Sequence, residues 1–437
     1  MYPPDPNPVN VQPAGRRPYN PVPVRPTRST RWPRAFALAA ALSAWALPAR
    51  GQALRSDPIV LGDGRVAVGG NVSATTSCAR VEEHSGCGND TGFFNFSDYE
   101  HSTLRMLRLT LNASVRAHRR LSFLAEVRSE NGDAPVPYAL YARIRPWANR
   151  SFDLQVGRIP PTFGAFARRA YVSDNLLIGF PLAYQYLTSL RPDALPATPD
   201  DLLRMRGRGW LSSFPVGDPT PRHGLPLATA FRWDTGVQAH LAAPWGDAAV
   251  AVTNGSLGNP RVRDDNSGKQ FAGRVTLKPL VGLVAGLSAS RAPYLAGDLL
   301  TTIGRGDDDG AFAQQAWGAD LEYSRDYYLV RSELIISRWT LPTAVPTLRS
   351  TSWLTEGSYK LKPGLHVAAR LDRLTFSEVA GTTRRDSWDA PVTRVEVGGG
   401  YLLRRNVEVK LSVQRNVRDG GRVPRLTLGA AQLAVWF

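Results

Sequence analysis

The chain has 437 residues, of which 43% are hydrophobic, and its 53 Lys and Arg against 37 Asp and Glu give a formal net charge of +16. This balance excludes a disordered polyelectrolyte and a bundle of apolar membrane helices. The 39 glycines and 34 prolines favour a fold with many turns over one of long helices. The chain has only two cysteines and no CxxC pair, which excludes a disulfide scaffold, a zinc ribbon and thioredoxin-like chemistry.

Residues 1–53 have the pattern of an export signal. A start rich in Pro and Arg is followed by an apolar run of 15 residues from Ala35 to Ala49, and then by the small-x-small sequence Gly51-Gln52-Ala53. The run is shorter than the roughly 20 residues that a membrane-spanning helix needs. We predict a secretory signal peptide with a long Pro/Arg-rich n-region over residues 1–53. The alternative is an uncleaved anchor.

The remaining chain alternates between apolar and polar residues. From Leu107 to Ala117 every second residue is apolar, and the same cadence returns in segments such as 395–403 and 407–413. Because successive side chains of a strand point to opposite faces, each segment has one apolar and one polar face. Tight turns such as Lys362-Pro-Gly364 alternate with longer polar links, which is typical of outer-membrane barrels.

We therefore predict an all-β fold, a transmembrane antiparallel β-barrel of about 16 strands, with roughly 14 or 18 as alternatives. The first strand lies in residues 54–100 and the others in residues 101–437. Closure is required because an open sheet edge in hydrocarbon leaves backbone groups unsatisfied. The strands are expected to begin near residues 65, 104, 121, 137, 151, 231, 247, 269, 283, 313, 327, 350, 364, 389, 406 and 425.

The C-terminus has a second feature of such barrels. The chain ends Leu433-Ala-Val-Trp-Phe437, an alternating strand with a terminal aromatic residue. Phe437 resembles the recognition signal of the outer-membrane barrel assembly machinery. That machinery and outer-membrane lipid are therefore expected partners, and the bacterial outer membrane is the expected location. A soluble β-sandwich or soluble barrel is the alternative, but many of the segments here run to ten or more residues, longer than usual soluble strands.

Three stretches of the barrel region share a further pattern. They are Leu154–Gly164, the sequence from Val252-Thr-Asn-Gly-Ser256 through Asp264–Pro279, and Trp317–Tyr323 with the following Val330-Arg-Ser-Glu-Leu334. Together they resemble the phosphate-selective porin O and P family over most of residues 100–437. The resemblance implies a homotrimeric porin of 16 strands with a constriction loop folded into the barrel.

If the apolar faces meet lipid, the polar faces line a water-filled lumen. A basic excess on these faces would favour anions modestly. The predicted pore-lining residues are Arg108, Arg116, Arg128, Arg143, Arg145, Arg274, Arg370, Arg394 and Lys410. In the alternative reading these residues pair with interspersed carboxylates, such as Glu126, Asp320 and Asp372, and only stiffen the wall.

Alternation stops over residues 160–230, and a loop of this length indicates a function. We predict that it folds into the lumen and forms the constriction. Thr198 followed by Pro199 predicts the start of a short helix within it. The residues expected to face solutes are Arg168, Arg169, Arg204, Arg206 and Arg208. The alternative is an extracellular cap or a latch between subunits.

Cys78 and Cys87 predict a disulfide that closes one loop, with metal binding beside His84 as the alternative. No HExxH or GxSxG motif is present, so we expect no enzyme, metal or cofactor. A dyad of Ser412 with a lumen histidine is the enzymatic alternative. Because the arginines follow strand parity and do not cluster with aromatics, nucleic acid is not an expected partner.

These features predict a passive diffusion porin for small hydrophilic solutes, anionic or neutral, with a preference for anions and phosphate among the candidates. The alternative function is a non-conducting structural or adhesion barrel plugged by residues 160–230.

Overall fold

The computed structural model describes residues 58–81, 85–87, 107–147, 151–230, 233–262, 268–306, 310–420 and 425–437. The signal peptide predicted over residues 1–53 lies outside them, and residues 54–437 form one compact unit. Within the described ranges, no helix is long and apolar enough to cross a membrane.

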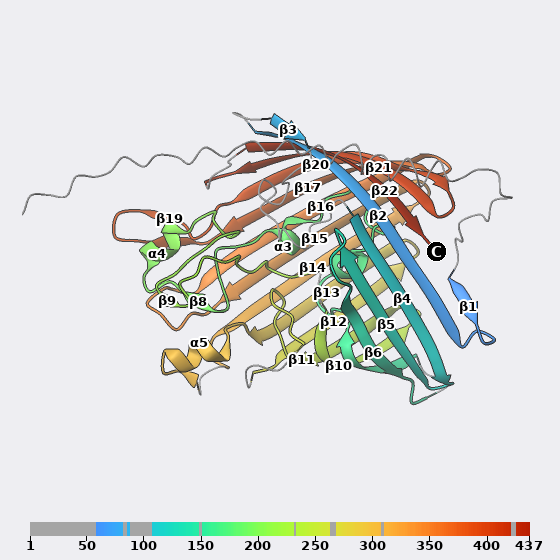
Figure 1. The fold of residues 1–437 in the computed structure, drawn as a ribbon, viewed down its shortest axis with the longest axis horizontal. Helices are drawn as coiled ribbons and strands as arrows, with labels where there is room; N and C mark the ends of the chain where they lie inside the picture. The colour runs from blue at the N-terminus through green and yellow to red at the C-terminus, as the bar shows by residue number, and fades with distance from the viewer. Residues whose placement is uncertain are drawn as a thin grey trace, which may run out of the picture. The chain divides into compact units, whose positions relative to one another are not determined.

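Sixteen antiparallel strands of the described chain form a closed barrel (Figure 1). Each pairs with its neighbours in chain order, and β22 pairs with β2 to close the sheet. The barrel strands are β2 (Val66–Val81), β4 (Leu107–His118), β5 (Leu121–Glu130), β6 (Val136–Ile144), β7 (Phe152–Ile159), β10 (Asp234–Ala243), β11 (Gly246–Thr253), β12 (Gln270–Leu280), β13 (Leu283–Pro293), β14 (Ala313–Arg325), β15 (Tyr328–Trp339), β16 (Leu348–Lys362), β17 (Leu365–Phe376), β20 (Val392–Arg404), β21 (Val407–Arg418) and β22 (Arg425–Trp436). Two short strands, β1 (Ile59–Leu61) and β3 (Ser85–Cys87), pair with opposite ends of β2.

The predicted fold is confirmed, because every barrel strand begins within three residues of its expected position. The short turns and the long loops also lie at opposite ends of the barrel, as expected. Turns such as Arg119–Arg120 and Val281–Gly282 join strands at one end of the barrel, which we call the short-turn end. Gly282 has a φ of 84°, and a Cβ there would lie 2.1 Å from the Ser324 carbonyl oxygen, so this tight turn requires glycine.

The long connections lie at the opposite end, which we call the long-loop end. Figure 1 shows most of their small elements there, whereas β1 and the C-terminus lie at the short-turn end. These elements are β8 (Ala194–Leu195), α4 (Pro199–Arg204), β9 (Val216–Gly217), α5 (Gly297–Thr302), β18 (Glu378–Ala380) and β19 (Arg385–Ser387).

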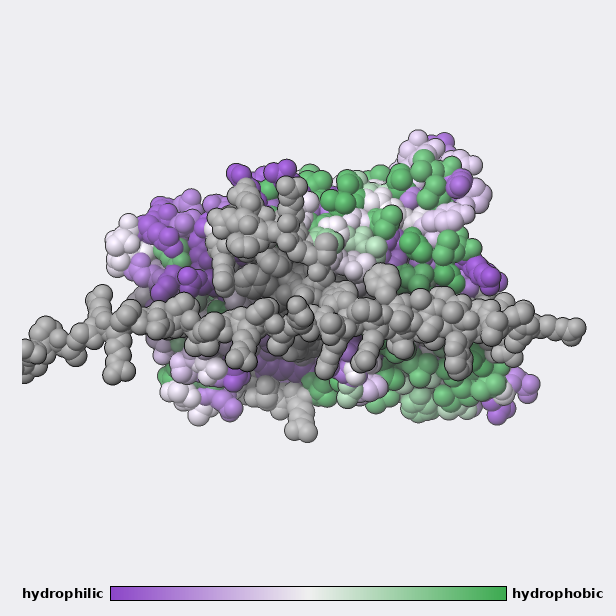
Figure 2. All heavy atoms as spheres, turned by 45° about the horizontal axis from the view of Figure 1, so that its top comes forward, coloured by the Kyte–Doolittle hydropathy of each residue, from purple (hydrophilic) through white to green (hydrophobic). Residues whose placement is uncertain are grey.

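The barrel wall is apolar outside and polar inside. Along β4, for example, Leu107, Leu109 and Leu111 are exposed whereas Arg108 and Thr110 are buried. This is the reverse of a soluble protein and suits a wall whose outer face meets hydrocarbon. Figure 2 shows hydrophobic residues gathered over the strands and hydrophilic residues at the long-loop end.

The C-terminal residue closes the seam of the barrel. The Phe437 backbone exchanges two hydrogen bonds of 3.0 Å with Gly70 of β2. A Cβ on Gly70 would lie 3.1 Å from the Phe437 ring and 2.7 Å from the Thr110 carbonyl oxygen, so the seam needs glycine at this position. Phe437 therefore packs where the first and last strands meet.

An apolar core lies inside the barrel, in addition to the apolar outer surface. It contains Leu182 and Leu202 from residues 160–233, together with Trp339, Trp388 and Leu374 from the wall and the loop after β17. The predicted inward-folded loop is thus present as a packed structure with its own core.

Candidate functional site

Residues 160–233, between β7 and β10, fill much of the lumen, and we call them the inserted segment. They contain a 3-10 helix, η1 (Phe166–Arg169), and the helices α3 (Leu182–Gln185) and α4. The α4 helix begins as predicted: the Thr198 hydroxyl accepts from the Asp201 backbone N–H, and the Asp201 carboxylate accepts from the Thr198 backbone N–H.

The beginning of the inserted segment is held by Glu333 of β15. The Glu333 carboxylate accepts hydrogen bonds from the Ala165 backbone N–H at 2.7 Å and from the Tyr184 hydroxyl at 2.8 Å. The Gly164 backbone N–H donates to the Ser288 hydroxyl at 3.2 Å. With a φ of 76°, Gly164 makes a bend that non-glycine residues rarely adopt, and this bend directs the chain inward.

Arg370 of β17 anchors the middle of the inserted segment. Its guanidinium pairs with Glu356 of β16 at 2.7 Å and donates to the Gly179 carbonyl at 2.6 Å and the Asn175 side-chain oxygen at 2.9 Å. Glu396 lies 3.4 Å from the same guanidinium. Because Arg370 is 1% exposed, this ion-pair cluster is removed from water and ties two strands to the segment.

A second set of wall charges binds the same stretch through its backbone. Arg394 of β20 donates to the Phe180 carbonyl at 2.8 Å, Asp372 accepts from the Leu182 N–H, and Glu396 accepts from the Gly179 N–H at 3.0 Å. Charged wall residues thus satisfy consecutive backbone groups that would otherwise be buried without partners.

Lys410 of β21 continues this row. Its ammonium donates at 2.5 Å to the carbonyls of both Val172 and Asn175, and it lies 3.4 Å from the Glu408 carboxylate. The His366 Nε2 is 3.2 Å from the Leu176 carbonyl. The segment from Val172 to Leu182 is therefore fixed to β17, β20 and β21.

Asp389, in the loop after β19, clamps the inserted segment at the long-loop end. Its carboxylate accepts from the backbone N–H groups of Ser189 at 2.7 Å and Gly207 at 2.8 Å, and from the Tyr186 hydroxyl at 3.2 Å. Burial raises the pKa of Asp389, although the donated backbone hydrogen bonds oppose that shift.

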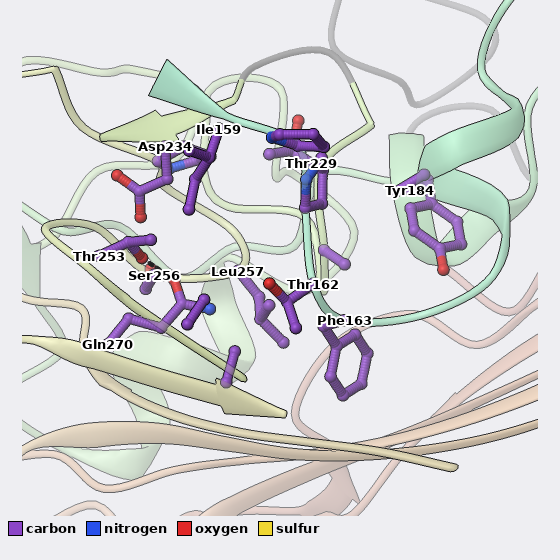
Figure 3. A pocket seen from close by; sticks show the side chains of 17 residues that line it. Ile159, Thr162, Phe163, Tyr184, Thr229, Asp234, Thr253, Ser256, Leu257 and Gln270 are labelled. Carbon is purple, nitrogen blue, oxygen red and sulfur yellow. Dashed lines mark hydrogen bonds between the residues drawn. The ribbon is translucent and has the colours of Figure 1, made fainter. Parts of the chain in front are cut away.

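A small cavity remains beside the base of the inserted segment (Figure 3). Asp234, Thr253 and Gln270 line it from the barrel strands, and Phe163 and Tyr184 line it from the segment. Its volume of about 40 Å³ is enough for one or a few waters and too small for a solute. It is therefore a packing gap and not a binding site.

Near the short-turn ends of β4, β6 and β14 the lumen stays accessible, whereas at β17 and β21 the inserted segment reaches His366 and Lys410. Arg143 of β6 is one-third exposed and pairs with Asp153 of β7 at 2.7 Å. Arg169, at the end of η1, meets this accessible space and pairs with Glu322 of β14 at 2.7 Å. Asp174 of the inserted segment is exposed there as well. Charges of both signs thus border the remaining space.

The structure places eight of the nine predicted pore-lining residues on the inner wall and one elsewhere. Arg145 lies after the end of β6 and is exposed in the short-turn connection. Arg116 and Arg143 are accessible, and the six others are buried: Arg108, Arg128, Arg274, Arg370, Arg394 and Lys410.

Most of the buried basic residues pair with a carboxylate, as the alternative reading proposed. The pairs are Arg108 with Glu130 at 2.6 Å, Arg128 with Glu126 at 2.8 Å, Arg274 with Asp320 at 2.6 Å, Arg370 with Glu356 at 2.7 Å and Lys410 with Glu408 at 3.4 Å. In the described structure these buried side chains are held in ion pairs within the wall, and their role as pore-lining residues stays a prediction.

The arginines predicted for the constriction separate into two groups. Arg169 faces the accessible lumen, and the side chain of Arg168 lies outside the described residues. The expectation for Arg204, Arg206 and Arg208 needs correction, because α4 and the residues after it lie at the long-loop end. Arg206 binds Ser387 at 2.9 Å and Asp419 at 3.0 Å there, and Arg204 and Arg208 are exposed.

Sequence reasoning missed the carboxylates that bind the inserted segment. Glu333, Glu356 and Glu396 all follow the inner-face parity of their strands, which is the signal that could have found them. Asp389 lies in a loop, where no periodicity marks it. The predicted disulfide concerns β2 and β3. Cys78 of β2 is disulfide-bonded, and its cross-strand neighbour is Cys87 of β3.

No protein-family model matches the chain, and no curated protein matches it. Solved structures are similar in fold. The in-vitro folded outer membrane protein OmpT of Vibrio cholerae has a TM-score of 0.54 at 10% identity, covering 86% of this chain and 99% of that chain. The anion-selective porin from Comamonas acidovorans has a TM-score of 0.53 at 11% identity, covering 85% and 99%. OmpF of Salmonella typhi, in a complex with daunomycin, has a TM-score of 0.54 at 9% identity, covering 86% and 99%.

These likenesses establish that the chain has the fold of porins. At about one identical residue in ten they establish the fold alone. The resemblance to the phosphate-selective porin O and P family stays a prediction.

Proposed function

We propose that this chain is an outer-membrane porin, a passive channel for small hydrophilic solutes. The observation that carries the proposal is a charged lumen that the inserted segment fills only in part and leaves accessible near the short-turn ends of β4, β6 and β14. The porin fold supports the same reading. A passive channel needs no catalytic residue, metal or cofactor.

The proposal includes a preference for anions, which rests on the short-turn mouth. Exposed basic residues surround that end, with Asp63 and Asp326 as exposed acidic residues among them. The basic residues are Arg65, Arg119, Arg120, Arg145, Lys278, Arg325, Lys360, Lys362, Arg404 and Arg405. Such a ring raises the local concentration of anions and lowers that of cations. Phosphate is one anion that it would attract, and assembly as a homotrimer follows the family resemblance.

A second candidate function is a non-conducting barrel, and one observation favours it. Arg370, Asp372, Arg394 and Glu396 are at most 1% exposed, so the inserted segment covers the wall at this level. If the same seal extends around the whole lumen, the barrel is plugged and serves a structural or adhesive role.

Planar-bilayer recording separates the two functions. Residues 54–437, refolded and shown to be β-structured by circular dichroism, are inserted in a bilayer under a KCl gradient. The porin proposal expects discrete conductance steps and a reversal potential of anion sign. Changing Arg119, Arg120, Arg404 and Arg405 to Glu should move that potential toward the cation value, and changing Arg385, on the β18–β19 hairpin, to Glu should leave it unchanged. A folded barrel without steps would support the plugged alternative.

A further inference from the structure

The lipid-facing wall carries a group of arginines on one side of the barrel. They lie on strands from β13 to β22, at outward positions of the apolar face, and all are exposed. We call this group the outer arginine belt, and its members are Arg291, Arg338, Arg349, Arg373, Arg415 and Arg425.

The belt lies close to the long-loop end of the wall. Arg338 is one residue before the end of β15, and Arg349 is the second residue of β16. Two exposed tryptophans lie on the same outer face, closer to the middle of the wall. Trp317 pairs with Ile336 and Trp353 pairs with Leu334, and both partners precede Arg338 on β15. The Arg338 guanidinium lies 5.4 Å from the centre of the Trp317 ring. Tryptophan beside arginine at the edge of an apolar band marks the level of lipid headgroups.

The wall around the belt presents no carboxylate to lipid. At the outward positions of the barrel strands from β13 to β22 the described residues include no Asp or Glu, because Asp320, Glu333 and Glu356 all lie on the inner face. Arg338 and Arg349 are directly opposite each other across β15 and β16. Like charges in such a cross-strand pair repel each other, so this arrangement calls for an anion from outside the chain.

Four members of the belt have side chains available for that anion. Arg338, Arg349, Arg373 and Arg415 form no ion pair with any residue that the structure describes. Arg291, by comparison, donates to the Gly310 carbonyl at 2.8 Å. A guanidinium group binds phosphate oxygens through two parallel hydrogen bonds, which makes these residues suited to phosphate.

The belt is one-sided, which distinguishes it from a general basic band. Outside β13 to β22, the one outward arginine among the described side chains of the barrel strands is Arg158 of β7, and it donates to the carbonyls of Trp233 and Pro137. A site that gathers charge on adjacent strands binds a defined set of headgroups. We propose that the outer arginine belt binds phosphate-bearing lipid headgroups in the leaflet on the long-loop side.

The test measures lipid retained by the folded barrel. Residues 54–437 are mixed in detergent with fluorescent lipid A, a glycolipid that carries two phosphates, and binding is followed by fluorescence anisotropy at physiological salt. One variant carries R338Q, R349Q, R373Q and R415Q. The control removes the same charge from long loops at the same end of the barrel, with R204Q, R208Q, R222Q and R385Q. Circular dichroism and thermal unfolding show whether each variant is folded.

The proposal expects affinity for lipid A to fall at least roughly tenfold in the belt variant and less than about twofold in the control. Phosphatidylcholine should not compete, and inorganic phosphate at millimolar concentration should not displace the lipid. An equal loss in both variants would reduce the effect to general charge attraction and overturn the site. Displacement by inorganic phosphate would show that the belt binds the free ion and not a lipid. These outcomes do not depend on whether the barrel conducts.

Discussion

Two sides of the lumen use one strand pattern for opposite purposes. On β17 and β20, inner-face charges such as Arg370, Asp372 and Arg394 are buried and satisfy the backbone of the inserted segment. Near the short-turn ends of β4 and β6, Arg116 and Arg143 stay accessible. A charged inner wall is therefore not by itself a solute path. What decides the role of each charge is whether the inserted segment covers it.

Removal of the inserted segment should give the largest effect. Replacement of residues 170–225 by a short Gly/Ser linker would uncover the wall that the segment covers, so we expect single-channel conductance to rise roughly twofold or more. Planar-bilayer recording measures this change. Unchanged conductance from a folded barrel would show that the segment does not narrow the path.

Loss of the central anchor should weaken the attachment of the inserted segment. Arg370→Met removes the cation that pairs with both Glu356 and Glu396, so Glu356 keeps Arg331 at 3.5 Å while the Gly179 carbonyl loses this donor. We expect a loss of about 3 kcal/mol in the free energy of unfolding, because removing one partner of a buried ion pair leaves the other charge buried without compensation. Denaturant unfolding in detergent measures it.

The matched control for this variant is Arg385→Met, since Arg385 forms an exposed pair with Glu378. Exposed pairs contribute little, so this control should change stability by less than about 1 kcal/mol. Similar losses in the two variants would mean that the buried cluster does not anchor the segment.

Charge reversal near the short-turn ends of β4 and β6 should change selectivity. Arg116→Glu together with Arg143→Glu places two negative charges on the accessible wall. The reversal potential in a KCl gradient should move toward the cation value by several millivolts, on the order expected for a modest change in local ion concentration. If it does not move, ions do not pass this part of the wall.

The smallest expected effect is a pH dependence from Asp174. Enclosure by the lumen raises the pKa of this carboxyl above its ordinary value, although Lys410, Arg331 and Arg169 partly oppose the shift. As pH falls, Asp174 therefore takes up its proton earlier than an ordinary Asp, and the lumen loses a negative charge. Anion preference should increase below neutral pH, and Asp174→Asn should show that increase at pH 7 and remove the step.

The fold was predictable because strand parity is a local property. The alternation between Leu107 and Ala117, for example, is visible without knowing which strand lies beside it. The partners of the inner-face charges could not be predicted from strand parity. Glu333 binds Ala165 and Tyr184, more than a hundred residues away in sequence, and parity cannot identify such contacts. The same limit explains Arg204 and Arg206, which the sequence groups with Arg169 but α4 places at the opposite end of the lumen.

We propose that the conducting path runs beside the inserted segment, past Asp174 and the short-turn ends of β4, β6 and β14. Single-channel recording of Asp174→Cys, before and after addition of a charged, membrane-impermeant thiol reagent, tests this path. We predict a stepwise fall in current on modification, and no change for Arg385→Cys in the β18–β19 hairpin. Complete labelling of Asp174→Cys, shown by mass spectrometry, with an unchanged current would contradict the claim.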